Sequence, residues 1–137
     1  MKITIPGKPI AKARPRFCRA GKFVKTYDAQ VSESGKWILS ARDQITNPIM
    51  DGAINLSCAF HMARPKSHYG TGRNAKKLKS SAPINHTYTP DLDNLVKFVK
   101  DCLNGLAWRD DSQVVFLTAY KIYDAEPKTV VIIQNYQ

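Results

Sequence analysis

The sequence predicts a single α+β domain in which two main helices pack on a mixed or antiparallel sheet of about four strands, in the order β-α-β-α-β-β. Three observations predict this class: a strongly amphipathic segment at residues 95–106, an alternating apolar segment at 52–62, and two β-rich segments after residue 112. The chain has 137 residues, of which 43% are hydrophobic, so it has room for a real core. We therefore expect residues 1–137 to form one domain.

The N-terminal third is predicted to contain a strand, a basic arm and a helix. Residues 2–5 alternate in polarity and are closed by a Pro-Gly pair, which indicates a short strand. Residues 6–27 contain three prolines and many cations, so we expect an irregular basic arm. Asp28 is the predicted N-cap of a helix over about 29–45. The apolar stripe of this helix would consist of Val31, Ile38, Ala41 and Ile45.

The middle of the chain combines a clear strand with a long loop. The segment 52–62 alternates, so it predicts a strand with one face on the core. Residues 65–90 show little periodicity and are rich in Gly, Ser, Lys and Asn, which predicts a long mobile basic loop. A loop of this length is uncommon in a compact domain and is usually functional or disordered. The core side of the strand would carry Ile54, Leu56, Cys58, Phe60 and Met62.

The C-terminal part predicts a helix followed by two strands. Apolar residues recur at helical spacing from Leu95 to Leu106, and Asn104-Gly105 marks the end of that helix. The β-rich segments 113–123 and 128–134 flank a four-residue polar connection, so we expect them to form an antiparallel hairpin.

Charge is the most unusual property of the composition. The chain has 21 Lys and Arg against 11 Asp and Glu, which gives a net charge of +10 and favours a polyanionic partner such as nucleic acid. The first 27 residues hold eight cations and no acid, and residues 52–90 hold six more, again with no acid. Such segregation favours a binding surface, although a lysine-rich surface with polar loops is an alternative explanation.

Several classes of function are excluded by missing features. No apolar segment approaches the ~20 residues of a spanning helix, and none follows Met1, so we expect neither a membrane nor a secreted protein. The three cysteines lack a CxxC pair and the histidine spacings match no zinc pattern, so a reducing cytoplasmic location without structural zinc is expected. The Gly-x-Gly at 70–72 neither follows a strand nor opens a periodic helix, so it does not predict a nucleotide-binding site. No small-molecule substrate is expected.

Carboxylates gather where the basic loop meets the amphipathic helix. Asp91 and Asp93 would point to the same side of an extended stretch, and Lys97 follows Asp93 by one helical turn. A second acidic pair, Asp110 and Asp111, precedes a predicted strand. Carboxylate oxygens are the ligands that Mg²⁺ prefers, so converging acids in a basic protein favour a metal site beside a bound phosphodiester.

Ordinary structural roles are the alternatives for these residues. An Asp before a helix is a common cap, and two Asp residues before a strand form a common turn. Lys97 has the alternative role of a solvated cation beside Asp93 and Asp101 on the polar face of the helix. Three mutually repelling acids are nevertheless costly without a cation among them. The sequence alone leaves both interpretations open.

The motif Asp91-Leu-Asp-Asn-Leu-Val-Lys97, followed by Asp101 and by Trp-x-Asp-Asp-x-Gln-Val at 108–114, resembles the RusA family of Holliday junction resolvases of bacteria and their phages. The opening Ile5-Pro-Gly-Lys-Pro-Ile-Ala-Lys-Ala-Arg-Pro-Arg16 is similar to that of the family's phage and Gram-positive branch. Some relatives carry an arginine cluster immediately before the first motif, whereas this chain has His-Thr-Tyr-Thr-Pro at 86–90.

The resemblance implies a small homodimeric endonuclease that depends on Mg²⁺, for which Mn²⁺ would substitute, and that nicks opposing strands of a four-way DNA junction symmetrically. By motif position, the metal-site carboxylates of the family fall on Asp91, Asp93 and Asp111, and its essential lysine falls on Lys97. Asp110 is an unassigned neighbour, either a second residue behind the site or a cap.

Branched DNA is therefore the expected partner, and the acid-free basic segments are its expected contacts. Two alternatives remain from the residues alone: a non-catalytic DNA- or RNA-binding module, and a metal-dependent nuclease acting on flap or duplex DNA. The residues expected to contact DNA are Lys12, Arg14, Arg16, Arg19, Lys66, Arg73, Lys76, Lys77 and Lys79.

Overall fold

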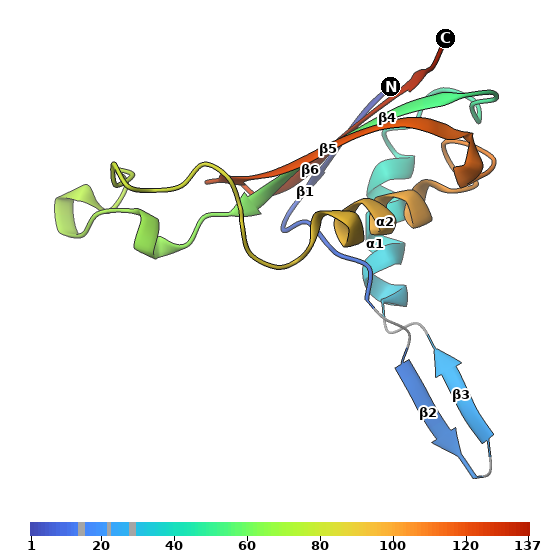
Figure 1. Cartoon of the computed structure of the whole chain (residues 1–137), viewed down its shortest axis with the longest axis horizontal. Coiled ribbons are helices and arrows are strands. Elements are labelled where there is room, and N and C mark those ends of the chain that lie inside the picture. The colour runs from blue at the N-terminus through green and yellow to red at the C-terminus, as the bar shows by residue number, and fades with distance from the viewer. Residues whose placement is uncertain (14–15, 22, 28–29) are drawn as a thin grey trace.

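A four-stranded mixed sheet with both helices on one of its faces forms the body of the computed structural model (Figure 1). The model describes residues 1–13, 16–21, 23–27 and 30–137, with strand residues 16–20 and 23–27 described by their backbone. The elements are β1 (Lys2–Pro6), β2 (Arg16–Ala20), β3 (Phe23–Tyr27), α1 (Val31–Arg42), β4 (Ile54–Ala63), α2 (Leu92–Leu103), β5 (Val114–Asp124) and β6 (Lys128–Asn135).

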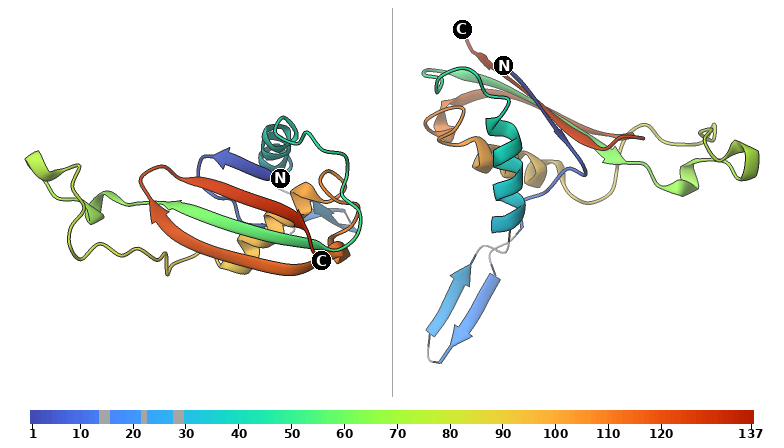
Figure 2. Two further views of the ribbon diagram at one scale, coloured as in Figure 1. Left: turned by 90° about the horizontal axis from the view of Figure 1, so that it is seen from above. Right: turned by 180° about the vertical axis from the view of Figure 1, so that it is seen from behind.

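The strand order in the main sheet is β1-β6-β4-β5, with β4 parallel to β5 and antiparallel to β6. The predicted fold class, an α+β domain with a mixed sheet, is confirmed. The predicted strand at 52–62 is also confirmed, because every second residue of β4 from Ile54 to Met62 is buried. Both helices cover this buried face, while no helix among the described residues lies on the opposite face of the sheet (Figure 2).

Helix α2 carries the predicted apolar face into the core. Leu95, Phe98 and Val99 are at most 1% exposed, and the ring of Phe98 meets that of Trp37 edge-on at a centroid distance of 6.0 Å. The helix ends at Leu103, and Gly105 has φ +78°, a conformation in which a glycine is favoured. The predicted end of this helix is therefore confirmed. Neither α1 nor α2 is long and apolar enough to cross a membrane.

Helix α1 is shorter than predicted and differs in its apolar stripe. It spans Val31–Arg42 with Gln30 at its N-cap position, and the predicted cap Asp28 lies outside the described residues. Val31 is 68% exposed, so its assignment to the core was wrong. The rest of the predicted stripe is confirmed, because Ala41 is buried and Ile38 and Ile45 pack partly buried against the core. The buried Trp37 joins them, because α1 turns this side toward α2 and β1.

The predicted C-terminal hairpin is wrong. Strands β5 and β6 run in opposite directions, but β4 lies between them and pairs with both. The connection at 125–127 crosses the end of β4. Three extended residues reach roughly 10 Å, about two strand spacings, so a short connection does not require the strands to be neighbours.

The segment 6–27 was predicted to be an irregular arm, and this prediction is wrong for residues 16–20 and 23–27. Residues 16–20 and 23–27 form the two-stranded antiparallel hairpin β2–β3, which projects from the body near the start of α1 (Figure 1). Ala20 pairs with Phe23, and at the turn Gly21 has φ +64°. A glycine that accepts positive φ is the usual signal for such a turn, and the prolines earlier in the arm obscured it.

The segment 65–90 contains no long helix or strand, as predicted, and extends beyond the sheet (Figure 1). It has two short 3₁₀ turns (Lys66–His68 and Gly72–Asn74). The last residues of this segment, which lead back to α2, are attached to β5. The ring of His86 lies edge-on to that of Tyr123 at a centroid distance of 5.0 Å, and the Lys121 ammonium donates to the Pro90 carbonyl at 2.7 Å. Its mobility stays a prediction.

Phe98→Ala tests the core that positions α2. Removing a ring that is 1% exposed leaves a cavity, so we expect a loss of about 3–5 kcal/mol in the free energy of unfolding. The measurement is chemical denaturation followed by circular dichroism. The control Val31→Ala, at an exposed position of α1, should change the stability by less than about 0.5 kcal/mol. Equal losses in the two variants would contradict the packing described above.

Candidate active site

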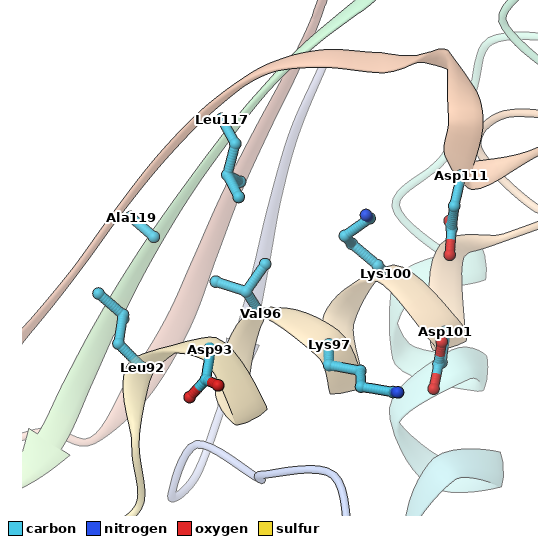
Figure 3. A pocket seen from close by; sticks show the side chains of 9 residues that line it. All are labelled: Leu92, Asp93, Val96, Lys97, Lys100, Asp101, Asp111, Leu117 and Ala119. Atoms are coloured by element: carbon cyan, nitrogen blue, oxygen red, sulfur yellow. The ribbon is translucent and has the colours of Figure 1, made fainter.

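A pocket of about 760 Å³ opens between α2 and the first half of β5 (Figure 3). Three of the four predicted catalytic residues, Asp93, Lys97 and Asp111, line it. Asp91, the fourth, does not line it, although it immediately precedes α2. The remaining lining residues are Leu92, Val96, Lys100, Asp101, Leu117 and Ala119.

The helical repeat brings the charged residues of α2 onto the pocket. Lys97 follows Asp93 by four residues, and Lys100 and Asp101 follow Lys97 by three and four, so all four lie along one side of the helix. The other side is apolar and buried in the core. Burial of the apolar side therefore determines which way these charges point. Lys100 and Asp101 were not among the predicted site residues, although their helical spacing from Lys97 was a usable signal.

Asp111 reaches the pocket from a different element. It begins a 3₁₀ turn (Asp111–Gln113) that leads directly into β5. The indole Nε1 of Trp108 donates a hydrogen bond to its Oδ1 at 2.9 Å, and the Trp108 side chain is fully buried. The carboxylate is thus held by a rigid donor while it remains half-buried at the pocket.

Asp110 has a structural role, that of a cap. It is the N-cap of the same 3₁₀ turn and accepts hydrogen bonds from the Ser112 amide at 3.1 Å and from the Ser112 hydroxyl. The Gln113 side chain accepts in return from the Asp110 amide at 3.0 Å, which completes a capping box. The Ser112 bonds stabilise the ionised carboxylate and lower the pKa of Asp110.

The motif Asp91-Leu-Asp-Asn at the start of α2 does not form such a cap. Asp91 occupies the N-cap position of α2 with an extended backbone, but its side chain makes no capping hydrogen bond. Within the described part of the chain, no hydrogen bond or ion pair is formed by the side chains of Asp91, Asp93 or Lys97. Charges left without protein partners at and beside a pocket are available to a ligand, so the capping interpretation of this motif loses support.

The carboxylate oxygens of the pocket are suitable ligands for a divalent metal, but their positions are not. The lining carboxylates offer the hard oxygen donors that Mg²⁺ takes. However, Asp93 and Asp111 lie at opposite ends of the pocket, with the two lysines between them (Figure 3). Among the described residues no three His, Cys, Asp or Glu side chains lie close enough to hold one ion. One chain therefore does not assemble the predicted three-carboxylate site.

The predicted DNA-contacting cations divide into three groups. The loop residues are exposed, whereas the Lys12 ammonium lies 3.3 Å from the Asp101 carboxylate at the margin of the pocket. Arg14 lies outside the described residues, and Arg16 and Arg19 belong to β2, which is described by its backbone. The exposed loop cations are Lys66, Arg73, Lys76, Lys77 and Lys79.

Comparisons with known proteins bear on this site. A family model described as "Endodeoxyribonuclease RusA" matches residues 6–134. The chain is also 36% identical over 140 residues to "Uncharacterized protein YqaN" of Bacillus subtilis (strain 168), and that similarity covers 98% of this chain and 96% of the relative. The family match includes every residue that lines the pocket.

Asp110→Ala and Asp91→Ala together test the capping assignments. Asp110→Ala should lower the melting temperature at neutral pH because the 3₁₀ turn loses its cap, whereas Asp91→Ala should leave it unchanged. The pKa of Asp110 is lowered in the folded chain from 3.8, so this stabilisation is present above that pH and is lost as the pH falls through the lower value. Thermal melts over this range measure it, and a larger effect at Asp91 would refute both assignments.

Proposed function

Because the chain belongs to the RusA endodeoxyribonuclease family, we propose that it is a structure-selective endonuclease that resolves four-way DNA junctions by paired, symmetric nicks. The observation that carries this proposal is the pocket, which the motif residues Asp93, Lys97 and Asp111 all line, in a protein with net charge +10. A polyanionic substrate fits that charge, and carboxylates beside lysines fit the hydrolysis of a phosphodiester.

The lysines and the carboxylates have different roles in the proposed reaction. The Lys97 ammonium, with Lys100 next to it, neutralises the scissile phosphate and the charge that develops on it. Asp91, Asp93 and Asp111 are, by motif position, the carboxylates that would hold Mg²⁺, or Mn²⁺ in its place, although the described residues of one chain do not bring the three together. When bound, such an ion stabilises negative charge on the phosphate and lowers the pKa of water.

The proposed chemistry is hydrolysis. The oxygen of a water molecule bonds to phosphorus, the bond from phosphorus to the 3′ oxygen breaks, and a proton goes to that oxygen. The products are a 5′-phosphate and a 3′-hydroxyl end. The rigid Trp108–Asp111 hydrogen bond keeps one carboxylate in place during this step, which avoids the cost of reorganising it.

Symmetric cutting of a four-way junction calls for two such sites related by a two-fold axis. The described residues of one chain form one pocket of this kind, so a homodimer is part of the proposal. The two basic segments, the β2–β3 hairpin and the 65–90 loop, project from the body in different directions (Figure 1). They are suited to hold separate arms of a branched substrate.

Neutral substitutions at the motif test the chemistry. Asp93→Asn and Asp111→Asn keep the side-chain shape but remove the negative charge, so each should slow single-turnover cleavage of a synthetic four-way junction by on the order of 100-fold or more. Lys97→Ala should also slow cleavage of the junction, with a smaller loss in junction affinity. EDTA should abolish cutting, and junction affinity without metal should be unchanged or tighter in the Asn variants.

The matched control is Asp110→Asn, which removes the neighbouring charge but keeps a residue that caps well. It should cut at close to the wild-type rate. Cleavage at wild-type rate by folded Asp93→Asn and Asp111→Asn would place the active site elsewhere. Tight binding without cutting in Mg²⁺ would support a non-catalytic binding module, and equal cutting of flap and duplex substrates would show a different nuclease.

The salt dependence of junction binding tests the loop. Each lost phosphate contact should reduce the slope of log affinity against log salt by about 0.9, so Lys76→Ala/Lys77→Ala should flatten it by roughly two contacts. Gel-shift titrations at several salt concentrations measure this slope. The control Lys36→Ala/Arg42→Ala removes two exposed cations of α1. If the control flattened the slope and the loop variant did not, DNA would contact a different face.

A further inference from the structure

The segment that leads from the basic loop into α2 lies along the second half of β5. The Tyr123 amide donates to the Ile84 carbonyl at 2.9 Å, and the His86 amide donates to the Lys121 carbonyl at 3.4 Å. Antiparallel pairing of this kind fixes the backbone of the segment as far as His86. Within the described part of the chain, no backbone–backbone hydrogen bond is formed by the four residues that follow.

One side chain supplies the hydrogen bonds that the backbone lacks there. The Lys121 ammonium donates to the Tyr88 carbonyl and, at 2.7 Å, to the Pro90 carbonyl. Among the described residues, these two are the only hydrogen bonds to the backbone of 87–90. Both carbonyls are directed to the same ammonium, so the chain curves around it immediately before it reaches Asp91.

Lys121 is half-buried and has no acidic partner. It follows Leu117 and Ala119 along β5 at two-residue spacing, so it lies on the face of the sheet that the helices cover. None of the ion pairs formed by the described residues includes it. Burial of an ammonium is costly unless its N–H groups are bonded, and hydrogen bonds from a charged donor are roughly twice as strong as neutral ones. Lys121 therefore serves the backbone as a donor and does not belong to an ion pair.

The charge of Lys121 also acts on His86 in the same segment. Burial lowers the pKa of His86, and repulsion by the Lys121 ammonium lowers it further. At neutral pH the uncharged ring lies edge-on to that of Tyr123, and its Nδ1 is buried without a hydrogen bond. The strand β5 thus holds this segment both by ring packing at His86 and by charged donors at the two later carbonyls.

Asp91 depends on these bonds because α2 does not fix its direction. The rotation of α2 directs residues inside the helix, such as Asp93 and Lys97, toward the pocket. Asp91 precedes the first turn with an extended backbone, and its side chain makes no capping hydrogen bond. The direction of Asp91 is therefore set by the peptide bond before it, whose carbonyl is that of Pro90.

We propose that Lys121 is a positioning residue of the active site, which holds the Tyr88 and Pro90 carbonyls and so sets the direction in which the chain enters α2 at Asp91. The inference rests on the proposed function, in which Asp91 belongs to the reacting groups. The chain itself uses two of the three N–H donors of Lys121. Lys121 differs in this from Lys97, whose side chain is left to the substrate.

Lys121→Met tests this role, because it keeps an apolar stem and removes the donors. Single-turnover cleavage at a saturating concentration of four-way junction should slow by on the order of 10-fold or more, since a small displacement of a reacting group costs much rate. The dissociation constant of the junction should change by less than about two-fold, and its salt dependence should stay the same, because the ammonium neutralises no phosphate.

Two further substitutions of Lys121 separate its hydrogen bonds from its bulk. Lys121→Arg keeps a charged group with several N–H donors, so it should cleave within about three-fold of the wild-type rate. Lys121→Gln is uncharged and its side chain is one bond shorter, so it should be as slow as Lys121→Met. This variant also decides the matter if the methionine variant does not fold.

The matched control is Lys128→Met on β6. Lys128 is also half-buried, but its ammonium lies 3.9 Å from the Asp124 carboxylate and donates to no residue before α2. The control should cleave a saturating junction at close to the wild-type rate. Equal slowing in the control and in Lys121→Met would contradict a specific role for Lys121.

Titration of His86 by nuclear magnetic resonance tests the contact without DNA. Lys121→Met should raise the pKa of His86, because the ammonium that disfavours the protonated ring is removed. Lys128→Met should leave this pKa unchanged. An unchanged pKa in Lys121→Met would show that the ammonium does not lie beside the segment, and the proposal would be overturned.

The outcomes separate this inference from the proposed function. A lower melting temperature of Lys121→Met with cleavage at the wild-type rate would make Lys121 a purely structural residue. A weaker junction affinity with a smaller salt slope would make it a DNA contact, and either result would overturn the positioning role. If the wild-type protein cut no DNA, the proposed function would fail together with this role. Wild-type cleavage with an unimpaired Lys121→Met variant would remove the role of Lys121 alone.

Discussion

The rotation of α2 about its own axis is the constraint on which the site depends. Its apolar side, which includes Leu95, Phe98 and Val99, lies in the same core cluster as the buried residues of β4. Exposing any one of these side chains costs about 1.5–3 kcal/mol, so the helix has one acceptable rotation. That rotation turns Asp93 and Lys97 outward to the pocket. The charges of the site are thus positioned by hydrophobic residues that contact no ligand.

Sequence periodicity predicted the elements better than it predicted their neighbours. The alternation in β4 and the helical spacing in α2 are local properties that match the faces buried in the fold. Which strand lies beside which is a tertiary property, and the short connection between β5 and β6 wrongly indicated that they pair. The central strand separates them because its own alternating face fills the middle of the core. The β2–β3 hairpin had a local signal in Gly21, but the basic and proline-rich surroundings outweighed it.

The candidate site shows the same division between local and tertiary information. The motif identified Asp93, Lys97 and Asp111, which line one pocket, but it gave no measure of how far apart they lie. That separation depends on the path of the chain after α2, including the buried Trp108 that anchors Asp111. The sequence also left Asp110 as either a second residue behind the site or a cap. Only the hydrogen bonds from Ser112 distinguish these roles.

The position of β1 has a consequence for how the chain folds. Its partner in the sheet is β6, close to the other end of the chain, and the Met1 ammonium donates to the Ile133 carbonyl at 2.9 Å. Closing so long a loop is entropically slow, and pairings distant in sequence delay folding more than they alter stability. During synthesis, Ile3 and Ile5 have no strand partner until β6 has left the ribosome. Of the strands in this sheet, the first to be made is therefore among the last to be secured, and the sheet is complete only once β6 has emerged.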